Sequence, residues 1–221
     1  GGLLMIIEVP KSYTFVKDGD IIAFEEKSVL KMKGRQGKFQ DIMYDITYRL
    51  KGSNRCYYCG EEVKPNKITL DHVYPQALGG PTIPQNMVPS CRNCNGKKED
   101  MTPNQFRAYL NLKDPGLQAQ FRREYFQTKT FQTRWVHILP EGWINETPIS
   151  DLIVTIDLSD TSTNKYKKIK EYYARCRQFP KPIIVDCHNF VLDGFTAVLY
   201  AKNNRIKEIP TIVLENVEVI F

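Results

Sequence analysis

The sequence predicts an α+β fold, with a cysteine-braced core and flanking helices followed by a small C-terminal α+β domain. Short strand-like runs alternate with helical patterns, and two C-x-x-C pairs lie on either side of a 31-residue insert. A polar stretch at 137–150, broken by Pro and Gly, reads as a linker. We therefore expect a β-rich segment at 1–36, the core with a helical extension at 37–136, and the C-terminal domain at 151–221.

The composition is that of a soluble globular protein. Its 221 residues suffice for one large or two small domains, and 42% of them are hydrophobic and 25% charged. No apolar run approaches the roughly 20 residues of a membrane span, and Leu3–Ile7 is too short for a signal peptide. We expect a cytoplasmic protein without a membrane partner.

The charge balance permits nucleic-acid binding without requiring it. The formal net charge is +6 and the sequence pI is about 8.9. Residues 51–150 hold 13 Lys/Arg against 9 Asp/Glu, so four of the six excess charges lie there. Counted as whole segments, the two ends of the chain are nearly neutral.

The N-terminal elements follow from periodicity. The runs "MIIEV", "YTFV" and "IIAF" predict short strands, with a turn at Asp18-Gly19-Asp20. A helix at 38–51 is predicted by apolar residues at i, i+3, i+4 and i+7 spacing, namely Phe39, Ile42, Met43, Ile46 and Leu50.

The cysteines predict a metal site. Two C-x-x-C pairs in a cytosolic-looking chain indicate metal ligands rather than disulfides, although a single pair would also suit a redox motif. Each pair lies in a Gly- or Asn-rich knuckle, "CYYCG" and "CRNCNG". Four thiolates bind zinc tetrahedrally in a closed site, so we expect a structural Zn²⁺ at Cys56, Cys59, Cys91 and Cys94.

A strand–strand–helix finger is predicted around the two knuckles. Residues 68–73 form a strand that ends in Asp-His, a loop follows, and a short strand near Met87-Val88 leads into a helix. Beyond it, Thr102-Pro103 caps a helix that ends near Asp114, and a second helix runs from Leu117 to about Thr128. Residues 151–221 then predict strand, helix, strand, helix, strand.

The motif "CYYCG…LDHVYPQALGG…NMVPSCRNCNGKK" resembles the HNH, or ββα-metal, nucleases in their four-cysteine branch, over about residues 50–100. The resemblance implies a zinc-stabilised ββα-metal core that hydrolyses DNA phosphodiester bonds with a divalent cation. Phage, restriction and antiphage-defence systems all use such nucleases.

Hydrolysis of a phosphodiester assigns roles to the residues of this motif. His72, with an ordinary pKa near 6.5, suits a general base. Asp71 and Asn95 offer hard oxygens for one Mg²⁺ or Mn²⁺. The resemblance gives Asn86 the role of fixing the loop and the His72 ring, and Pro75 and Gly79-Gly80 would break the strand so that both Asp71 and His72 reach the site.

Simpler interpretations stay open for these residues. The histidine could be structural, Asn86 could cap a turn, and Asn95 could follow the knuckle for conformational reasons. Three basic side chains could contact phosphate or be ordinary helix-surface residues, namely Arg92, Lys97 and Lys98.

The segment "FPKPIIVDCHNFVLDGFTAVLYAKNNRIKEIPTIVLE" resembles the ParB-N/sulfiredoxin-like fold, over about residues 151–215. In active relatives an Arg at the helix start grips nucleotide phosphate, but this chain reads Gly194-Phe195-Thr196-Ala197 there. We therefore expect a scaffold or partner-binding role, with a protein or a nucleotide as the candidate partner. Cys187 and His188 are expected in an exposed hairpin turn.

The favoured hypothesis is a metal-dependent HNH endonuclease. One alternative is a zinc-stabilised nucleic-acid-binding module that does not cut. Another is a nucleotide-binding ParB-like regulator, which the missing Arg disfavours.

Overall fold

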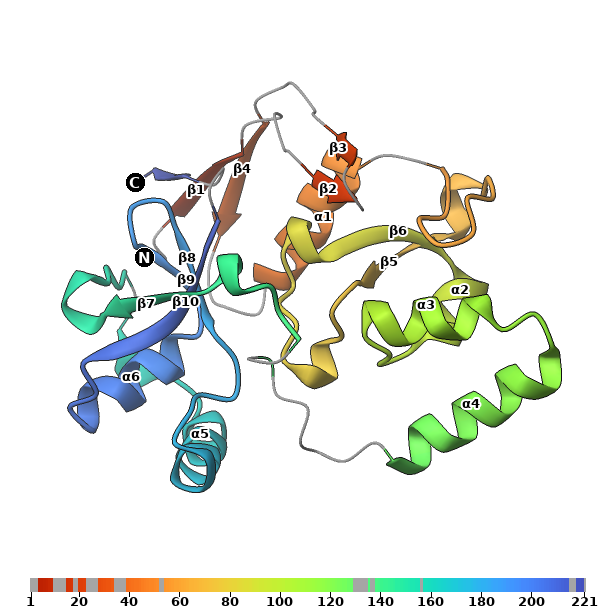
Figure 1. The fold of residues 1–221 in the computed structure, drawn as a ribbon. Helices are drawn as coiled ribbons and strands as arrows, with labels where there is room; N and C mark the ends of the chain where they lie inside the picture. Colours follow the sequence, from red (N-terminus) through yellow and green to blue (C-terminus); the bar gives the residue numbers. More distant parts are fainter. Residues whose placement is uncertain are drawn as a thin grey trace. The chain divides into compact units, whose positions relative to one another are not determined.

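The computed structural model shows two compact units (Figure 1). The cysteine unit comprises residues 51–82 and 86–139, and the sheet unit comprises residues 1–50, 83–85 and 140–221. The structure describes residues 4–9, 15–17, 20–22, 28–33, 39–51, 54–128, 135, 138–155, 157–214 and 218–220. Among these residues, no helix combines the length and the apolar composition that a bilayer span requires.

A ββα finger forms the centre of the cysteine unit. Strands β5 (Ile68–His72) and β6 (Met87–Cys91) pair antiparallel, with Ile68 opposite Cys91 and His72 opposite Met87. Helix α2 (Arg92–Lys98) follows β6 directly. The finger has the order of elements that the sequence predicts, and the β6–α2 junction carries the second cysteine knuckle into the helix.

Two further helices complete this unit, α3 (Pro103–Asn111) and α4 (Pro115–Thr128). Thr102 caps α3 and exchanges hydrogen bonds with Gln105 in a capping box, with Pro103 at the first helical position. The helix start predicted at Thr102-Pro103 is therefore confirmed. A single apolar cluster joins α3 to the knuckles and contains Cys56, Cys91, Cys94, Met101, Phe106 and Tyr109.

The sheet unit is built on a four-stranded sheet in the order β7-β10-β8-β9. The central strands β8 (Ile183–Asp186) and β10 (Glu208–Leu214) are parallel, and the edge strands β7 (Asn145–Pro148) and β9 (Val191–Asp193) are antiparallel to them. Helices α5 (Thr163–Cys176) and α6 (Phe195–Asn203) lie together below this sheet in Figure 1. The core between them contains Phe179, Ile183, Val185, Val198, Tyr200 and Ile209.

The predicted helix start after Gly194 is confirmed, because α6 begins at Phe195. Gly194 has φ +97°, and a Cβ there would lie 2.4 Å from Cγ2 of Ile183. Only glycine therefore fits between β9 and α6. Cys187 and His188 are exposed in the β8–β9 turn, where Asp186 Oδ1 accepts hydrogen bonds from the backbone N–H groups of His188 and Phe190.

Among the described residues, the sheet unit also contains a second sheet, a hairpin and a helix. Strands β1 (Leu4–Val9), β4 (Ser28–Lys33) and β11 (Glu218–Ile220) form an antiparallel sheet in the order β11-β1-β4. Strands β2 (Phe15–Lys17) and β3 (Asp20–Ile22) form the hairpin. Helix α1 (Phe39–Lys51) buries Phe39, Met43 and Ile46, as its periodicity predicts. Across the described parts of both units, short 3-10 helices lie at Pro65–Lys67, Gln76–Leu78, Pro84–Asn86, Glu141–Trp143, Ile149–Asp151 and Leu158–Asp160.

The structure differs from the predicted division of the chain in two places. The stretch 137–150 carries β7, which pairs with β10 through four residues and is held by a hydrogen bond of 2.6 Å between the hydroxyls of Thr147 and Thr211. The segment 1–36 is not separate either, because β1 pairs with β11 at the C-terminal end. Both pairings join residues far apart in the sequence, and local composition carries no signal for such contacts.

Two predicted elements, the strand after residue 151 and the second helix of the extension, also differ in detail. The first strand expected after residue 151 is reduced to an isolated bridge between Ile153 and Phe190. The second helix of the extension begins at Pro115 rather than Leu117. Asp18, Gly19 and the side chains of Ile42 and Leu50 lie outside the part of the chain that the structure describes.

Candidate active site

The four knuckle cysteines lie together. Their Sγ atoms all lie within 4.8 Å of one another, with Cys59 exposed and the other three buried. Backbone hydrogen bonds from Cys56 N to Glu61 O and from Gly60 N to Cys56 O, each 2.9 Å, close the first knuckle. In the second knuckle, Cys94 N donates to Cys91 Sγ over 3.3 Å. Four thiolates gathered in this way fit one tetrahedral Zn²⁺, which needs each sulfur about 2.3 Å from the metal.

Asp71 lies at the end of β5 and is held by two side chains. Its Oδ2 accepts a hydrogen bond from the Tyr58 hydroxyl and lies 3.0 Å from Lys98 Nζ. Lys98 is fully buried and also donates to the backbone carbonyl of His72 over 2.6 Å. Tyr58 lies between the first two cysteines and Lys98 ends α2, so both knuckles contribute a group that fixes the Asp71 carboxylate.

Burial and charge act in opposite directions on this cluster. Burial raises the pKa of Asp71, while the Lys98 charge and the Tyr58 hydroxyl favour the carboxylate. Burial lowers the pKa of Lys98, and Asp71 opposes that shift. Burial and the Asp71 charge both raise the pKa of Tyr58, so its hydroxyl stays protonated and donates.

His72 makes its contacts through a different set of groups. Its Nε2 lies 3.0 Å from the Thr82 hydroxyl, and Gln76 Nε2 donates to that same oxygen over 2.6 Å. Burial, helped by the Lys98 charge, lowers the pKa of His72 to about 4. The imidazole is therefore neutral at neutral pH, which is the form that a general base requires.

Asn86 holds the loop between the two strands. It is fully buried, and its Oδ1 accepts from Tyr74 N over 2.8 Å. Its Nδ2 donates to the carbonyls of Tyr74 (2.9 Å) and Pro81 (2.8 Å). The loop passes so close to itself that a Cβ at Gly80 would lie 1.9 Å from the carbonyl oxygen of Tyr74, so glycine is required there.

The segment that carries these residues matches a known family. Residues 56–111 match the family model of the HNH endonucleases. The match begins at Cys56, spans both knuckles, the finger and α3, and covers about a quarter of the 221 residues. A search of curated proteins finds no match for the chain.

Within the HNH segment, Asn95 and Asp71 lie on the same side of β5. Asn95 Nδ2 donates to the Thr69 hydroxyl over 3.0 Å, and Thr69 is two residues before Asp71 on the strand, so their side chains share a face. These hard oxygen donors suit Mg²⁺ or Mn²⁺. Because Asp71 Oδ2 is held by Lys98 and Tyr58, the site would offer a cation at most one carboxylate oxygen, which fits an ion that keeps several waters.

The three basic residues of the HNH segment differ in exposure. Arg92 is exposed and Lys97 is half-buried. Lys98, expected on the helix surface, is instead buried against Asp71 and His72, so it is not available to a phosphate. Lys98 is buried because it ends α2 with its side chain directed toward β5, where its positive charge neutralises the buried carboxylate of Asp71.

Sequence reasoning missed Tyr58, Gln76 and Thr82. The sequence gives only a weak indication that Tyr58 belongs to the site. It lies inside a C-x-x-C knuckle, so its side chain is expected to contact the elements that the knuckle packs on. Gln76 and Thr82 carry none, since polar loop residues are ordinary and their hydrogen bonds to each other and to His72 become visible only in three dimensions.

Proposed function

We propose that the HNH segment is a metal-dependent endonuclease that hydrolyses DNA phosphodiester bonds, with His72 as the general base and one Mg²⁺ or Mn²⁺ at Asp71 and Asn95. The observation that carries the proposal is the family match over residues 56–111, with a neutral, buried His72 beside Asp71 at the end of β5. The cation would stabilise charge on the phosphate and the leaving oxygen.

The chain's own residues supply the rest of the chemistry. The His72 imidazole accepts the proton of the attacking water, and Thr82 and the fixed β5 backbone orient its ring. Asn86 holds the loop that carries Thr82 in register with β5. Cys56, Cys59, Cys91 and Cys94 would hold the structural Zn²⁺, which would fix the knuckles that carry Tyr58, bonded to Asp71, and Asn95, bonded to Thr69.

A second candidate function is a zinc-stabilised DNA-binding module without cleavage. It is favoured by the contacts that already occupy the site. Asp71 Oδ2 is engaged by Lys98 and Tyr58, and Nε2 of the 9% exposed His72 is engaged by Thr82. Substrate binding would have to rearrange these contacts before the reaction.

For residues 151–221 of the sheet unit we propose a ParB/sulfiredoxin-like domain that serves as a scaffold or binds a partner. The β8–β9 hairpin, the helix start after Gly194 and the last strand through Ile209-Pro210 support this proposal. Thr196, the polar residue at the helix start, is only 5% exposed, which disfavours nucleotide hydrolysis there.

The test compares plasmid cleavage by the wild type, His72→Ala and His188→Ala, in Mg²⁺ or Mn²⁺ and without added divalent cation. His72→Ala should cut about 10²–10⁴-fold more slowly, which is the usual contribution of a positioned base. Its DNA affinity should stay nearly unchanged, because Lys and Arg contacts to phosphate dominate affinity. His188→Ala, in the exposed β8–β9 turn, is the matched control and should cut normally.

Two results would change the assignment. Wild-type protein that binds DNA but cuts with neither cation would favour the binding module. Cleavage by His72→Ala at the wild-type rate would mean that another group is the base.

A further inference from the structure

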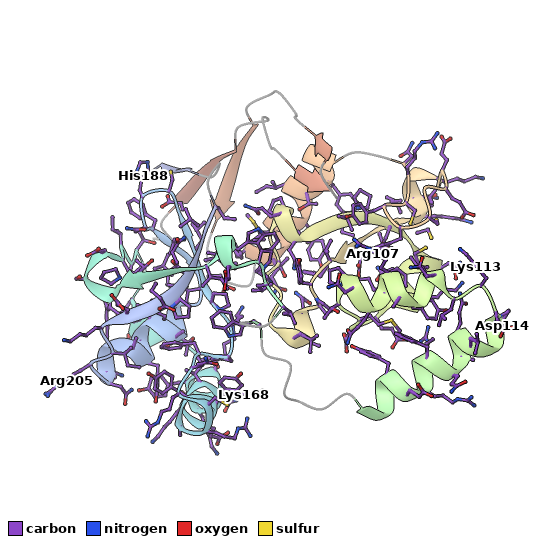
Figure 2. The ribbon with its side chains drawn as sticks, viewed as in Figure 1. Arg107, Lys113, Asp114, Lys168, His188 and Arg205 are labelled. Carbon is purple, nitrogen blue, oxygen red and sulfur yellow. The ribbon has the colours of Figure 1, made fainter. Side chains whose placement is uncertain are left out.

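Helix α5 of the sheet unit is strongly basic, although the C-terminal segment that contains it is nearly neutral as a whole. Residues 151–221 contain ten Lys/Arg and nine Asp/Glu, yet residues 165–177 contain six Lys/Arg and one acidic residue, Glu171. All six basic residues are exposed, and we call them the α5 basic surface: Lys165, Lys167, Lys168, Lys170, Arg175 and Arg177. Figure 2 labels Lys168 among the side chains of this helix.

The opposite face of α5 is apolar and packs on the core of the sheet unit. Tyr166, Ile169 and Tyr173 recur at i, i+3 and i+7 and pack on the core of the sheet unit. The rings of Tyr166 and Tyr173 each lie 5.5 Å, between centroids, from the ring of Tyr200. The cations lie outside this packed face, so the core does not require them.

The cations do not stabilise the helix either. Lys165, Lys167 and Lys168 lie near the N-terminus of α5, where the helix dipole disfavours positive charge, and the first turn contains no acidic residue. Among the described side chains, no carboxylate forms an ion pair with Lys165, Lys167, Lys168 or Lys170, whereas Lys98, Arg122 and Lys181 all have such a partner. The charge of α5 is therefore left for an external anion.

We propose that the α5 basic surface is a second DNA-binding surface of this protein, which contacts the phosphate backbone of duplex DNA. The inference rests on the proposed function only in taking DNA as the substrate. A helix of 14 residues is about 20 Å long, and one strand of B-DNA presents a phosphate about every 3.4 Å, so several phosphates face its length. Contacts of this kind add affinity without reading sequence.

The chemistry of the surface favours DNA over a membrane. An interfacial membrane helix places large apolar side chains in the bilayer, but the apolar residues of α5 are packed on the sheet-unit core. The helix also carries a guanidinium group and an aromatic ring that suit contacts to phosphate and sugar. Arg175 Cζ lies over the Tyr172 ring, 5.8 Å from its centroid.

The test removes three charges from α5 and, as a matched control, three from another part of the same unit. The α5 variant is Lys167→Gln/Lys168→Gln/Lys170→Gln. The control is Lys202→Gln/Arg205→Gln/Lys207→Gln, at exposed positions at and after the end of α6, where Figure 2 labels Arg205. A third variant, Lys167→Arg/Lys168→Arg/Lys170→Arg, keeps the charge. Binding to a fluorescent duplex is measured without added divalent cation, at salt concentrations between about 50 and 200 mM.

The α5 variant should bind about 10- to 100-fold more weakly at 0.1 M salt, and the slope of log K against log salt should fall by about 2 to 3, because each phosphate contact contributes about 0.9. The control and the Lys-to-Arg variant should bind like the wild type. Circular dichroism should show equal folding of all variants.

Several outcomes would overturn the proposal. Wild-type binding and slope in the α5 variant would exclude the surface as a DNA contact. Equal weakening in the α5 variant and the control would mean that net charge alone acts. Loss of binding to phosphatidylserine vesicles with unchanged DNA binding would assign the surface to lipid. Cleavage of plasmid by the wild type is measured separately with Mg²⁺, so its absence would count against the nuclease proposal and not against this surface.

Discussion

Lys98 and Asp71 form an ion pair inside the cysteine unit, with Nζ 3.0 Å from Oδ2 and side chains 0% and 7% exposed. The two residues lie 27 positions apart, one at the end of α2 and one near the end of β5. Lys98 also donates to the His72 carbonyl, so one ammonium group fixes the two neighbouring residues of the candidate site. Its removal should therefore affect stability and the site together.

Lys98→Met should destabilise the cysteine unit by about 3–5 kcal/mol, because it leaves the buried Asp71 carboxylate without its counter-charge. The double variant Lys98→Met/Asp71→Asn should recover part of this loss, since it leaves no buried charge. Thermal unfolding of zinc-loaded protein measures both. The exposed Lys113→Met serves as control. A melting temperature of Lys98→Met equal to that of the wild type would show that the pair contributes nothing.

The Asn86 clamp makes a local prediction. Asn86→Ala removes three hydrogen bonds to the loop, of which the one to Pro81 is buried and the two to Tyr74 are partly buried, so we expect a loss of roughly 3 kcal/mol. The Tyr74 amide, which donates to Asn86 Oδ1, should exchange with deuterium much faster than in the wild type. Asn104→Ala, at an exposed position of α3, should change neither quantity. Unchanged exchange at Tyr74 would argue against the clamp.

The cysteine cluster predicts the metal content. Cys91→Ser should bind much less zinc and should lose the ββα finger, because structural zinc contributes about 10 kcal/mol or more to folds of this kind. Cys176→Ser, outside the cluster, should keep one zinc per chain. Elemental analysis and circular dichroism measure both. A Cys91→Ser protein with the wild-type fold and no zinc would contradict a structural role.

The sequence predicts the elements whose signals are local. The two C-x-x-C knuckles, the Gly79-Gly80 turn and the Thr102-Pro103 cap each depend on a few neighbouring residues, and the finger and α3 lie where these signals indicate. Asn86 also lies as expected in the loop, although its bonds to the Tyr74 and Pro81 backbone could not be derived from composition.

The remaining features depend on contacts between distant residues. Nothing in "GKK" tells which lysine turns inward, and the burial of Lys98 follows only from the carboxylate on β5. The polar run "NETP" becomes β7 because β10 offers it an edge, not because its residues favour a strand. The net charge of residues 151–221 gives no sign of the basic helix α5, because eight of the nine acidic residues of that segment lie outside it.

His72 predicts a pH dependence with a definite sign. Burial and the Lys98 charge lower its pKa to about 4 in the folded protein, against about 6.5 in the unfolded chain. Between these values the unfolded state binds more protons, so this residue costs no stability above pH 6.5 and destabilises the fold increasingly as the pH falls toward 4. In NMR spectra without added divalent cation, the His72 ring signals, assigned by their absence in His72→Gln, should stay at the neutral position from pH 7.5 to 5. Titration of these signals with a midpoint near 6.5 would show that the ring is solvated, and the candidate base would then be half-protonated near that pH.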